Sequence, residues 1–251
     1  MSARFGSMAD EFYASTRLFM KMDMSLDRES VLHFFDQVRK AFPSMDRFHR
    51  RNDGGLILEE QPAVGQSRRW LRLERDSVRF GYFAPPPDQD LRDLANVIVE
   101  QAPYHLTFSD LDFDHVEVVY GFDLEYRGNH DQLIAESLWA DHPLGGFLLD
   151  PDARHVIDAQ PFLGIALSPE CDLQAYIEVK SRTGTYEVRT GEYEAQPLSV
   201  ILTVRKYWGI GSKEALPSVY NRLFDIADEL TAGKLVPLLV NPIAQAIASR
   251  S

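Results

Sequence analysis

Cysteine is almost absent from this chain of 251 residues, which contains Cys171 alone. A single cysteine excludes an intramolecular disulfide and a metal site built from several thiolates. Glycine and proline, at 15 and 14 residues, are too few for a collagen-like or low-complexity chain. Apolar residues make up 45% of the sequence, which excludes an intrinsically disordered protein. The composition is that of a globular protein.

Long apolar runs are also missing. No stretch approaches the roughly 18 consecutive apolar residues that read as a membrane span. The segment from Met1 to Glu11 has no apolar core after a basic start, so no secretory signal is predicted. We therefore expect a protein of the reducing cytoplasm without membrane contact.

Basic residues are outnumbered by acidic ones, and their distribution along the chain is uneven. Lys and Arg number 26 against 38 Asp and Glu, a formal net charge of -12, so nucleic acid is not an expected partner. Residues 1–83 include 14 basic and 12 acidic side chains, whereas residues 84–251 include 12 and 26. Opposite signs favour docking of one part on the other, or of two copies head to tail. Two separately solvated faces would show the same pattern.

The apolar periodicity of residues 1–108 predicts a β-α-β-β-β-α order. A strand is expected from Phe12 to Met24, and a helix is expected between Asp27 and Pro43. Three further strands and a second helix are then expected at 56–58, 68–75, 78–82 and 88–103.

Residues 109–251 repeat this order with additions. A strand over 116–126 and a helix over 131–139 come first. A long helix ending at Gly233, a C-terminal strand from Leu235 to Val240 and a short helix come last. Between these, four strands are expected at 162–167, 173–179, 186–189 and 198–204.

Helices with one apolar stripe and antiparallel strands predict an α+β fold made of two tandem, similar halves. Each half would be a curved antiparallel sheet that grips its helices. The order of elements is similar to the β-α-β4-α layout of TATA-binding-protein-like domains, a helix-grip arrangement. Because this resemblance rests on element order, it implies a fold and no particular function.

A Glu-x-Lys pair on an expected strand, Glu178 and Lys180, follows Asp158 by about 20 positions. In PD-(D/E)xK nucleases, two carboxylates on neighbouring strands hold Mg²⁺ and a lysine orients the attacking water. Against this interpretation, no proline precedes Asp158, and phosphate contacts need surrounding cations, whereas this half is strongly acidic. A solvated cross-strand ladder of charges explains the same residues.

Alternating carboxylates precede a histidine in the run Asp110, Asp112, Asp114 and His115. The run fails as an EF-hand calcium loop, because His115 stands where that loop needs glycine. Three acids beside a histidine could still bind a hard cation. A solvent-facing lead into the following strand is the alternative.

An arginine-bearing strand with aromatic neighbours is the remaining candidate. Arg68, Trp70 and Arg72 alternate on one face of an expected strand, and Arg79 lies on the next strand. Guanidinium groups in this arrangement could receive a carboxylate or phosphate ligand, or an acidic protein surface.

The sequence patterns of common enzymes are absent: there is no HExxH, no GxSxG and no P-loop triplet. We therefore expect a non-catalytic binding or assembly protein that uses charged sheet faces to contact a protein partner or a second copy of itself. No cofactor is expected for that function. The alternative is a Mg²⁺-dependent nuclease centred on Glu178 and Lys180.

Overall fold

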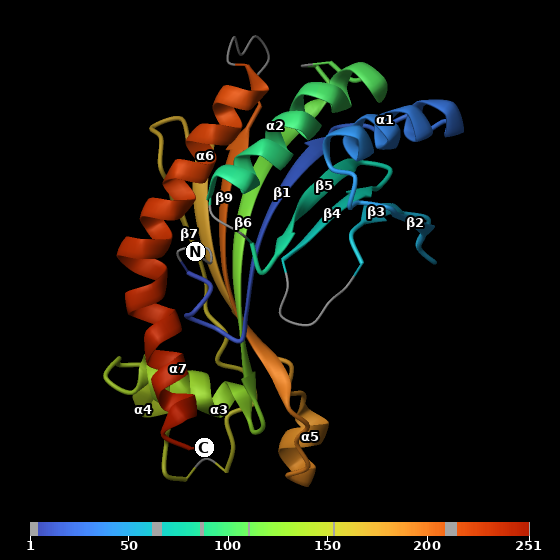
Figure 1. The fold of residues 1–251 in the computed structure, drawn as a ribbon. Helices are drawn as coiled ribbons and strands as arrows, with labels where there is room; N and C mark the ends of the chain where they lie inside the picture. Colours follow the sequence, from blue (N-terminus) through green and yellow to red (C-terminus); the bar gives the residue numbers. More distant parts are fainter. Residues whose placement is uncertain are drawn as a thin grey trace.

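The structure, a computed structural model, describes residues 5–61, 67–85, 88–109, 111–152, 154–208 and 215–250. The chain is an α+β protein built on one large antiparallel sheet with the order β2-β3-β4-β5-β1-β6-β9-β8-β7 (Figure 1). The strands are β1 (Glu11–Met20), β2 (Arg47–Arg50), β3 (Leu56–Glu59), β4 (Arg68–Leu73), β5 (Ser77–Phe83), β6 (Phe113–Tyr126), β7 (Phe162–Ala166), β8 (Leu173–Lys180) and β9 (Gln196–Tyr207).

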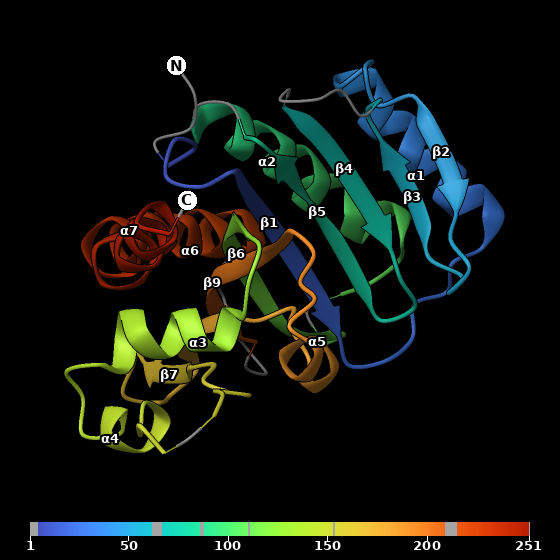
Figure 2. The same ribbon diagram turned by 90° about the horizontal axis from the view of Figure 1, so that it is seen from below.

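Most helices lie on one face of this sheet. Figure 2 shows β1 to β5 in front of α1 and α2, with their other face bare. The helical segments are α1 (Arg28–Ala41), α2 (Asp88–His105), α3 (His130–Ile134), η1 (Ala135–Trp139), α4 (Gly145–Leu148), α5 (Thr185–Thr190), α6 (Leu216–Leu230), η2 (Thr231–Val240) and α7 (Asn241–Ala248), where η marks π-helical turns.

The elements expected in the first half are present, with shifted ends. The alternation of β1 stops at Met20, and Met22 beyond it is 69% exposed. Helix α1 begins after Asp27, whose Oδ1 accepts the Ser30 N–H at 3.0 Å and caps the first turn. The short edge strand β2 was not expected, because its charged residues show no apolar alternation.

The segment 186–189 forms part of helix α5, so the strand expected there is wrong. Gly184 caps this helix, and its N–H donates to the Glu187 carboxylate at 3.0 Å. Gly191 ends the helix in the left-handed conformation, with φ 73°. Three strands, and not four, therefore follow the first helix of the second half.

The expected helix end at Gly233 and the expected strand from Leu235 to Val240 are also wrong. The helix continues through η2 into α7, and the wide π-helical turns accommodate Pro237, which has no N–H to donate. Leu235 and Val240 are fully buried in the core, which stabilises this continuation. By length and composition alone, the 33-residue helix Leu216–Ala248 could cross a membrane. The core helices of soluble proteins can be equally long and apolar. Here α6 packs on β6 and β9.

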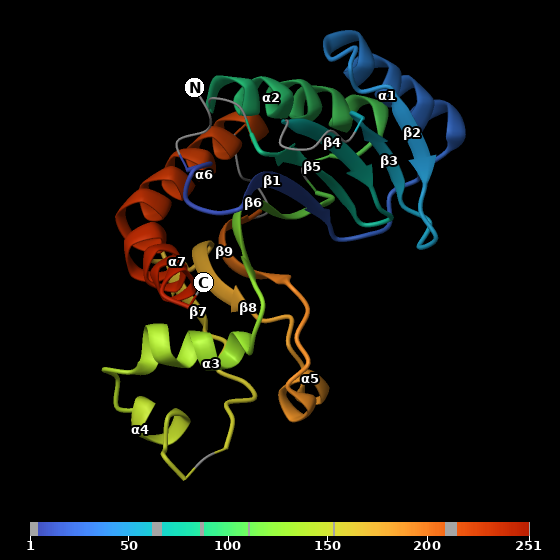
Figure 3. The ribbon, with the colours of Figure 1, turned by 60° about the horizontal axis from the view of Figure 1, so that its bottom comes forward.

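The two halves share one sheet and one hydrophobic core. Strand β1 pairs with β6 from Glu11 to Met20, which joins the sheet across the expected boundary at residue 108. Helices α2 and α6 contact each other above this seam. At the other end of the molecule, α3 packs beside α7, as Figure 3 shows.

Candidate partner-binding face

The helix-free face of the sheet has a row of charged side chains that crosses the strands. In β1 the buried side chains point to the helices, and alternate residues such as Arg17 point to the bare face. Register pairing puts Arg79 opposite both Arg72 and Arg17, on strands β5, β4 and β1. We call these three residues the arginine row. Glu117 of β6 and Arg205 of β9 continue its line.

The arginine row shares a single nearby glutamate. The carboxylate of Glu74 lies 2.6 Å from Arg72, 3.1 Å from Arg79 and 3.6 Å from Arg17. Asp53, which is half exposed, adds a second contact to Arg72 at 3.0 Å. The Nε atoms of Arg17 and Arg72 are buried without a hydrogen-bond partner, whereas Nε of Arg79 is the atom that contacts Glu74. The row therefore has hydrogen-bond donors and positive charge that its own carboxylates do not satisfy.

Burial and mutual repulsion act on the guanidinium groups of the row. Burial, with the neighbouring Arg79 charge second, lowers the pKa of Arg17 to about 10. Burial also lowers the pKa of Arg79. Like charges directly opposite one another in a sheet are destabilising, so an added anion at this place would be favourable.

At the far end of the line, Glu117 and Arg205 form an ion pair. Arg205 Nε donates to Glu117 Oε1 at 2.7 Å, and His115 Nε2 lies 3.4 Å from the same oxygen. Burial raises the pKa of Glu117, but hydrogen bonding from His115 and the charge of Arg205 outweigh burial and hold this pKa below its usual value. Glu117 and Arg205 thus compensate each other's charge at this end of the line.

Aromatic side chains flank the row on both sides. On one side the Phe19 ring stacks on His115, with centroids 4.0 Å apart, and the Arg17 guanidinium covers the Phe19 ring at 3.4 Å. On the other side the Trp70 and Phe83 rings are 6.2 Å apart, and Trp70 Nε1 is buried without a hydrogen-bond partner. A ligand on the row would meet both cationic and aromatic surface.

The structure brings the arginines singled out in the sequence to this face. Trp70, Arg72 and Arg79 face the same side, and Arg68 lies over the Phe83 ring at 4.5 Å. Sequence reasoning missed Arg17, because it lies about 50 residues before β4 and becomes a neighbour through β1–β5 pairing. The alternation of β1 was the available signal, since it put Arg17 on the polar side.

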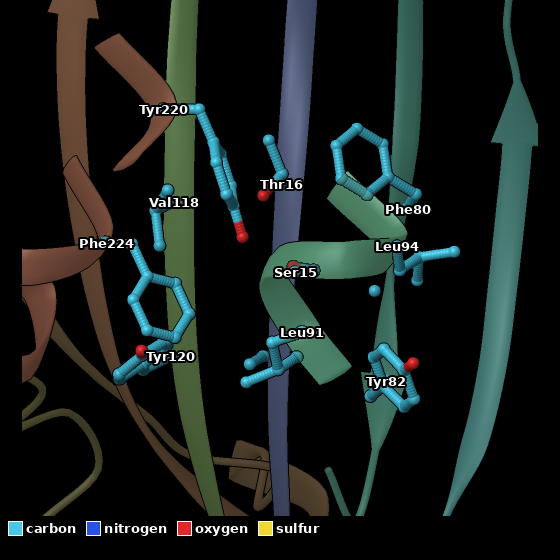
Figure 4. A pocket seen from close by; sticks show the side chains of 12 residues that line it. Ser15, Thr16, Phe80, Tyr82, Leu91, Leu94, Val118, Tyr120, Tyr220 and Phe224 are labelled. Atoms are coloured by element: carbon cyan, nitrogen blue, oxygen red, sulfur yellow. The ribbon is translucent and has the colours of Figure 1, made fainter. Parts of the chain in front are cut away.

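The opposite, helix-covered side is filled by side chains. Leu91 and Leu94 of α2, with Tyr220 and Phe224 of α6, close over the central strands (Figure 4). The space left between them and the sheet is about 10 Å³, which is room for one water at most. This cavity cannot hold a ligand.

A second concave feature lies beside α1. A cleft of about 520 Å³ opens between α1 and the turns that follow β2 and β4. Its walls include the half-exposed Phe48 and Leu32, and three arginines surround them: Arg28, Arg50 and Arg75. The cleft therefore combines apolar walls with cationic groups, in the same half as the arginine row.

The residues of the nuclease hypothesis lie at the other end of the sheet. Asp158 is exposed in the loop before β7, and its Oδ1 accepts the Gln160 N–H at 3.3 Å. Glu178 and Lys180 face the bare side of β8 and form an ion pair at 3.0 Å. The described residues include no group of three His, Cys, Asp or Glu side chains that could hold a metal ion. The nuclease interpretation also counts the expected strand from Leu235 to Val240 as the last strand of its core, and that segment is helical.

The acidic run before β6 has two structural roles. Asp110 lies outside the described residues. Asp112 accepts hydrogen bonds from the Ser109 N–H at 2.7 Å and hydroxyl at 3.0 Å, which closes a turn. Asp114 contacts His115 Nδ1 at 2.7 Å and thereby extends the Glu117 network.

Comparisons with known proteins assign no family to this chain. No family model matches it, and no curated protein is similar to it at a significant level. Among solved structures it is similar to the di-domain ARO/CYC BexL from the BE-7585A biosynthetic pathway, with a TM-score of 0.20 and 7% sequence identity. The match covers 95% of this chain and 99% of that one. A TM-score this low carries no argument about fold or function.

Proposed function

We propose that this chain is a non-catalytic binding module that holds an acidic segment of a protein partner on the arginine row. One observation carries the proposal: Arg17, Arg72 and Arg79 lie side by side on the bare face, and all three share the carboxylate of Glu74. Further carboxylates that bind to such a cluster form favourable charged hydrogen bonds with its guanidinium groups. A cytoplasmic location belongs to the same proposal.

The dimensions and charge of the face favour carboxylates on a peptide. Neighbouring strands lie about 4.8 Å apart, so the three arginines form a short cationic strip. A short acidic segment can match this strip, and apolar side chains of the segment can cover the flanking Phe19 and Trp70. A long polyanion such as nucleic acid would in addition meet the repulsion of a protein with a net charge of -12.

We also propose that the two halves are repeats of one unit that build this face together. Outward from the β1–β6 seam, the sheet order is β1-β5-β4-β3 on one side and β6-β9-β8-β7 on the other, which supports matching β1 with β6 and β5 with β9. The arginine row then belongs to the first unit, while Glu117 and Arg205 belong to the second.

The test is calorimetric titration with a short oligoglutamate peptide at low ionic strength. The double variant Arg72→Gln/Arg79→Gln removes two guanidinium groups from the row, and Arg39→Gln removes an exposed guanidinium from α1 as a matched control. Because charged hydrogen bonds contribute about 1.5–3 kcal/mol each, we expect binding at least about tenfold weaker in the double variant. The control should bind like the natural protein.

Two results would overturn the proposal. One is the absence of oligoglutamate binding, or binding that the double variant retains in full. The other is preferential binding of a single-stranded oligonucleotide of equal charge, which would assign the row to phosphates. Raising the salt concentration should weaken true binding at the row, since the contact is ionic.

A further inference from the structure

Strand β7 is an open, uncharged edge of the sheet. Within the described part of the chain it pairs with β8 alone, and all five of its residues are exposed. Phe162 is 66% exposed, Leu163 57% and Ile165 58%, so both faces of this edge present large apolar side chains. Exposed apolar edge strands template pairing with another strand, and folded proteins normally protect them.

The opposite edge of the same sheet has that protection. Strand β2 is four residues long and includes Arg47, His49 and Arg50. Short, charged strands of this kind discourage edge-to-edge pairing. The contrast singles out β7 as the edge that is left free to pair.

The hydrogen bonds between β7 and β8 determine which backbone N–H and C=O groups of β7 point away from the sheet edge. The Leu167 N–H donates to the Leu173 carbonyl at 2.7 Å, and the Pro161 carbonyl accepts from Val179 at 3.0 Å. Odd-numbered residues therefore bond inward to β8. Because bonding alternates along an antiparallel strand, Phe162, Gly164 and Ala166 direct their N–H and C=O groups outward.

We propose that β7 pairs antiparallel with β7 of a second copy, about a two-fold axis at Gly164. Gly164 then exchanges hydrogen bonds with Gly164 of the second copy. This is possible because its N–H and C=O groups point away from β8. On either side, Phe162 lies opposite Ala166 of the other copy, a large side chain against a small one. Leu163 lies opposite Ile165, apolar against apolar. The strand is thus complementary to itself, and the contact is isologous and closed.

Pairing at β7 leaves the arginine row free. The row lies on β4, β5 and β1, several strands away from this edge. The two-fold contact would join two sheets into one and cover Phe162, Leu163 and Ile165 in both copies. Dimerisation and acidic-peptide binding are therefore separate properties, and each can fail without the other.

The test measures molar mass by sedimentation or light scattering over a wide range of concentrations. We expect the natural protein to be a dimer and Leu163→Lys to be a monomer, because lysine has no partner opposite Ile165. The double variant Leu163→Lys/Ile165→Glu restores opposite charges at directly facing positions, so we expect the dimer to return. Leu111→Lys, at a leucine that is 70% exposed elsewhere, is the matched control and should remain dimeric.

Three outcomes would overturn this proposal. A monomeric natural protein would show that the edge stays unpaired. A dimer that survives Leu163→Lys would place the interface elsewhere. Open-ended oligomers dispersed by both Leu163→Lys and Arg50→Glu would show that β7 pairs with β2 head to tail.

Discussion

At the scale of single residues, the unusual feature is three arginines that face one another across strands. Arg79 faces both of the others in register, and among the described residues Glu74 is the carboxylate that contacts all three. Like charges that face one another across strands cost stability in the free protein. Residues of this kind are expected at binding sites.

Arg79→Gln is therefore expected to change the free energy of unfolding by no more than about 1 kcal/mol, because it removes repulsion from Arg72 and Arg17 together with the contact to Glu74. Urea denaturation of the purified protein measures this. Glu74→Gln should cost more, about 2 kcal/mol, since it leaves the arginines without their shared carboxylate. A clear loss of stability in Arg79→Gln would contradict the view that the row is unsatisfied.

His130 is a buried histidine that is held neutral. Its Nδ1 accepts the Arg182 N–H at 3.3 Å, and its Nε2 lies 3.3 Å from the Tyr126 carbonyl, an arrangement that needs one proton on Nε2. Burial lowers the pKa of His130 below 6.5. The unfolded chain therefore takes up this proton at a higher pH than the folded protein does.

As the pH falls below about 6.5, stability should decrease, because protons then bind preferentially to the unfolded state. The measurement is the free energy of unfolding between pH 8 and pH 5. In His130→Asn, the free energy of unfolding should depend less steeply on pH over this range, even if the variant is less stable at every pH. The exposed His142→Asn is the control and should retain the slope of the natural protein.

At the scale of elements, the seam between β1 and β6 depends on a close approach at Gly121. A Cβ atom at this position would lie 2.0 Å from Cζ of Tyr13, the residue opposite it in register. The half-buried Tyr13 ring lies across the glycine, and burial, with Asp123 second, raises the pKa of its hydroxyl to about 12. The pair is one contact of the ladder that joins the two halves of the sheet.

Gly121→Ala is expected to destabilise the protein by about 1–3 kcal/mol, because the added methyl group displaces the Tyr13 ring. In a Tyr13→Ala background the same substitution should cost much less. A double-mutant cycle by chemical denaturation gives the coupling between the two positions. Equal costs in both backgrounds would show that another contact restricts Gly121.

At the scale of the whole molecule, the two halves share one hydrophobic core and one sheet. A single hydrophobic core runs from the first half to the second, and the β1–β6 ladder crosses the middle of the sheet. Leu71 of β4 and Leu202 of β9 belong to this core, at 0% and 1% exposure. Strands of both halves therefore contribute to the same buried surface.

We expect a single unfolding transition in urea when near- and far-ultraviolet circular dichroism are followed together. Leu71→Ala and Leu202→Ala should each lower that one transition, by about 2–5 kcal/mol. Two transitions, each shifted by one of the variants, would mean that residues 1–108 and 109–251 unfold as separate domains.

Periodic patterns by themselves determined the α+β class and most of the elements. Alternation in β1 and β6, and the helical spacing of Val31, Phe34 and Val38 in α1, are local properties of the chain. The grouping of Arg68, Trp70 and Arg72 on one face followed from the same alternation. The uneven charge distribution was also visible, and it pointed to the half that includes the arginine row.

Tertiary structure alone decided what depends on contacts between distant segments. Leu235 and Val240 are helical because the core buries them as a continuation of α6, although their short apolar run resembles a strand. Arg17 joins Arg72 and Arg79 because β1 inserts between β5 and β6. The bare edge of β7 exists because no further strand or helix covers it among the described residues. Sequence patterns report local geometry, whereas strand order and burial arise from the packing of the whole chain.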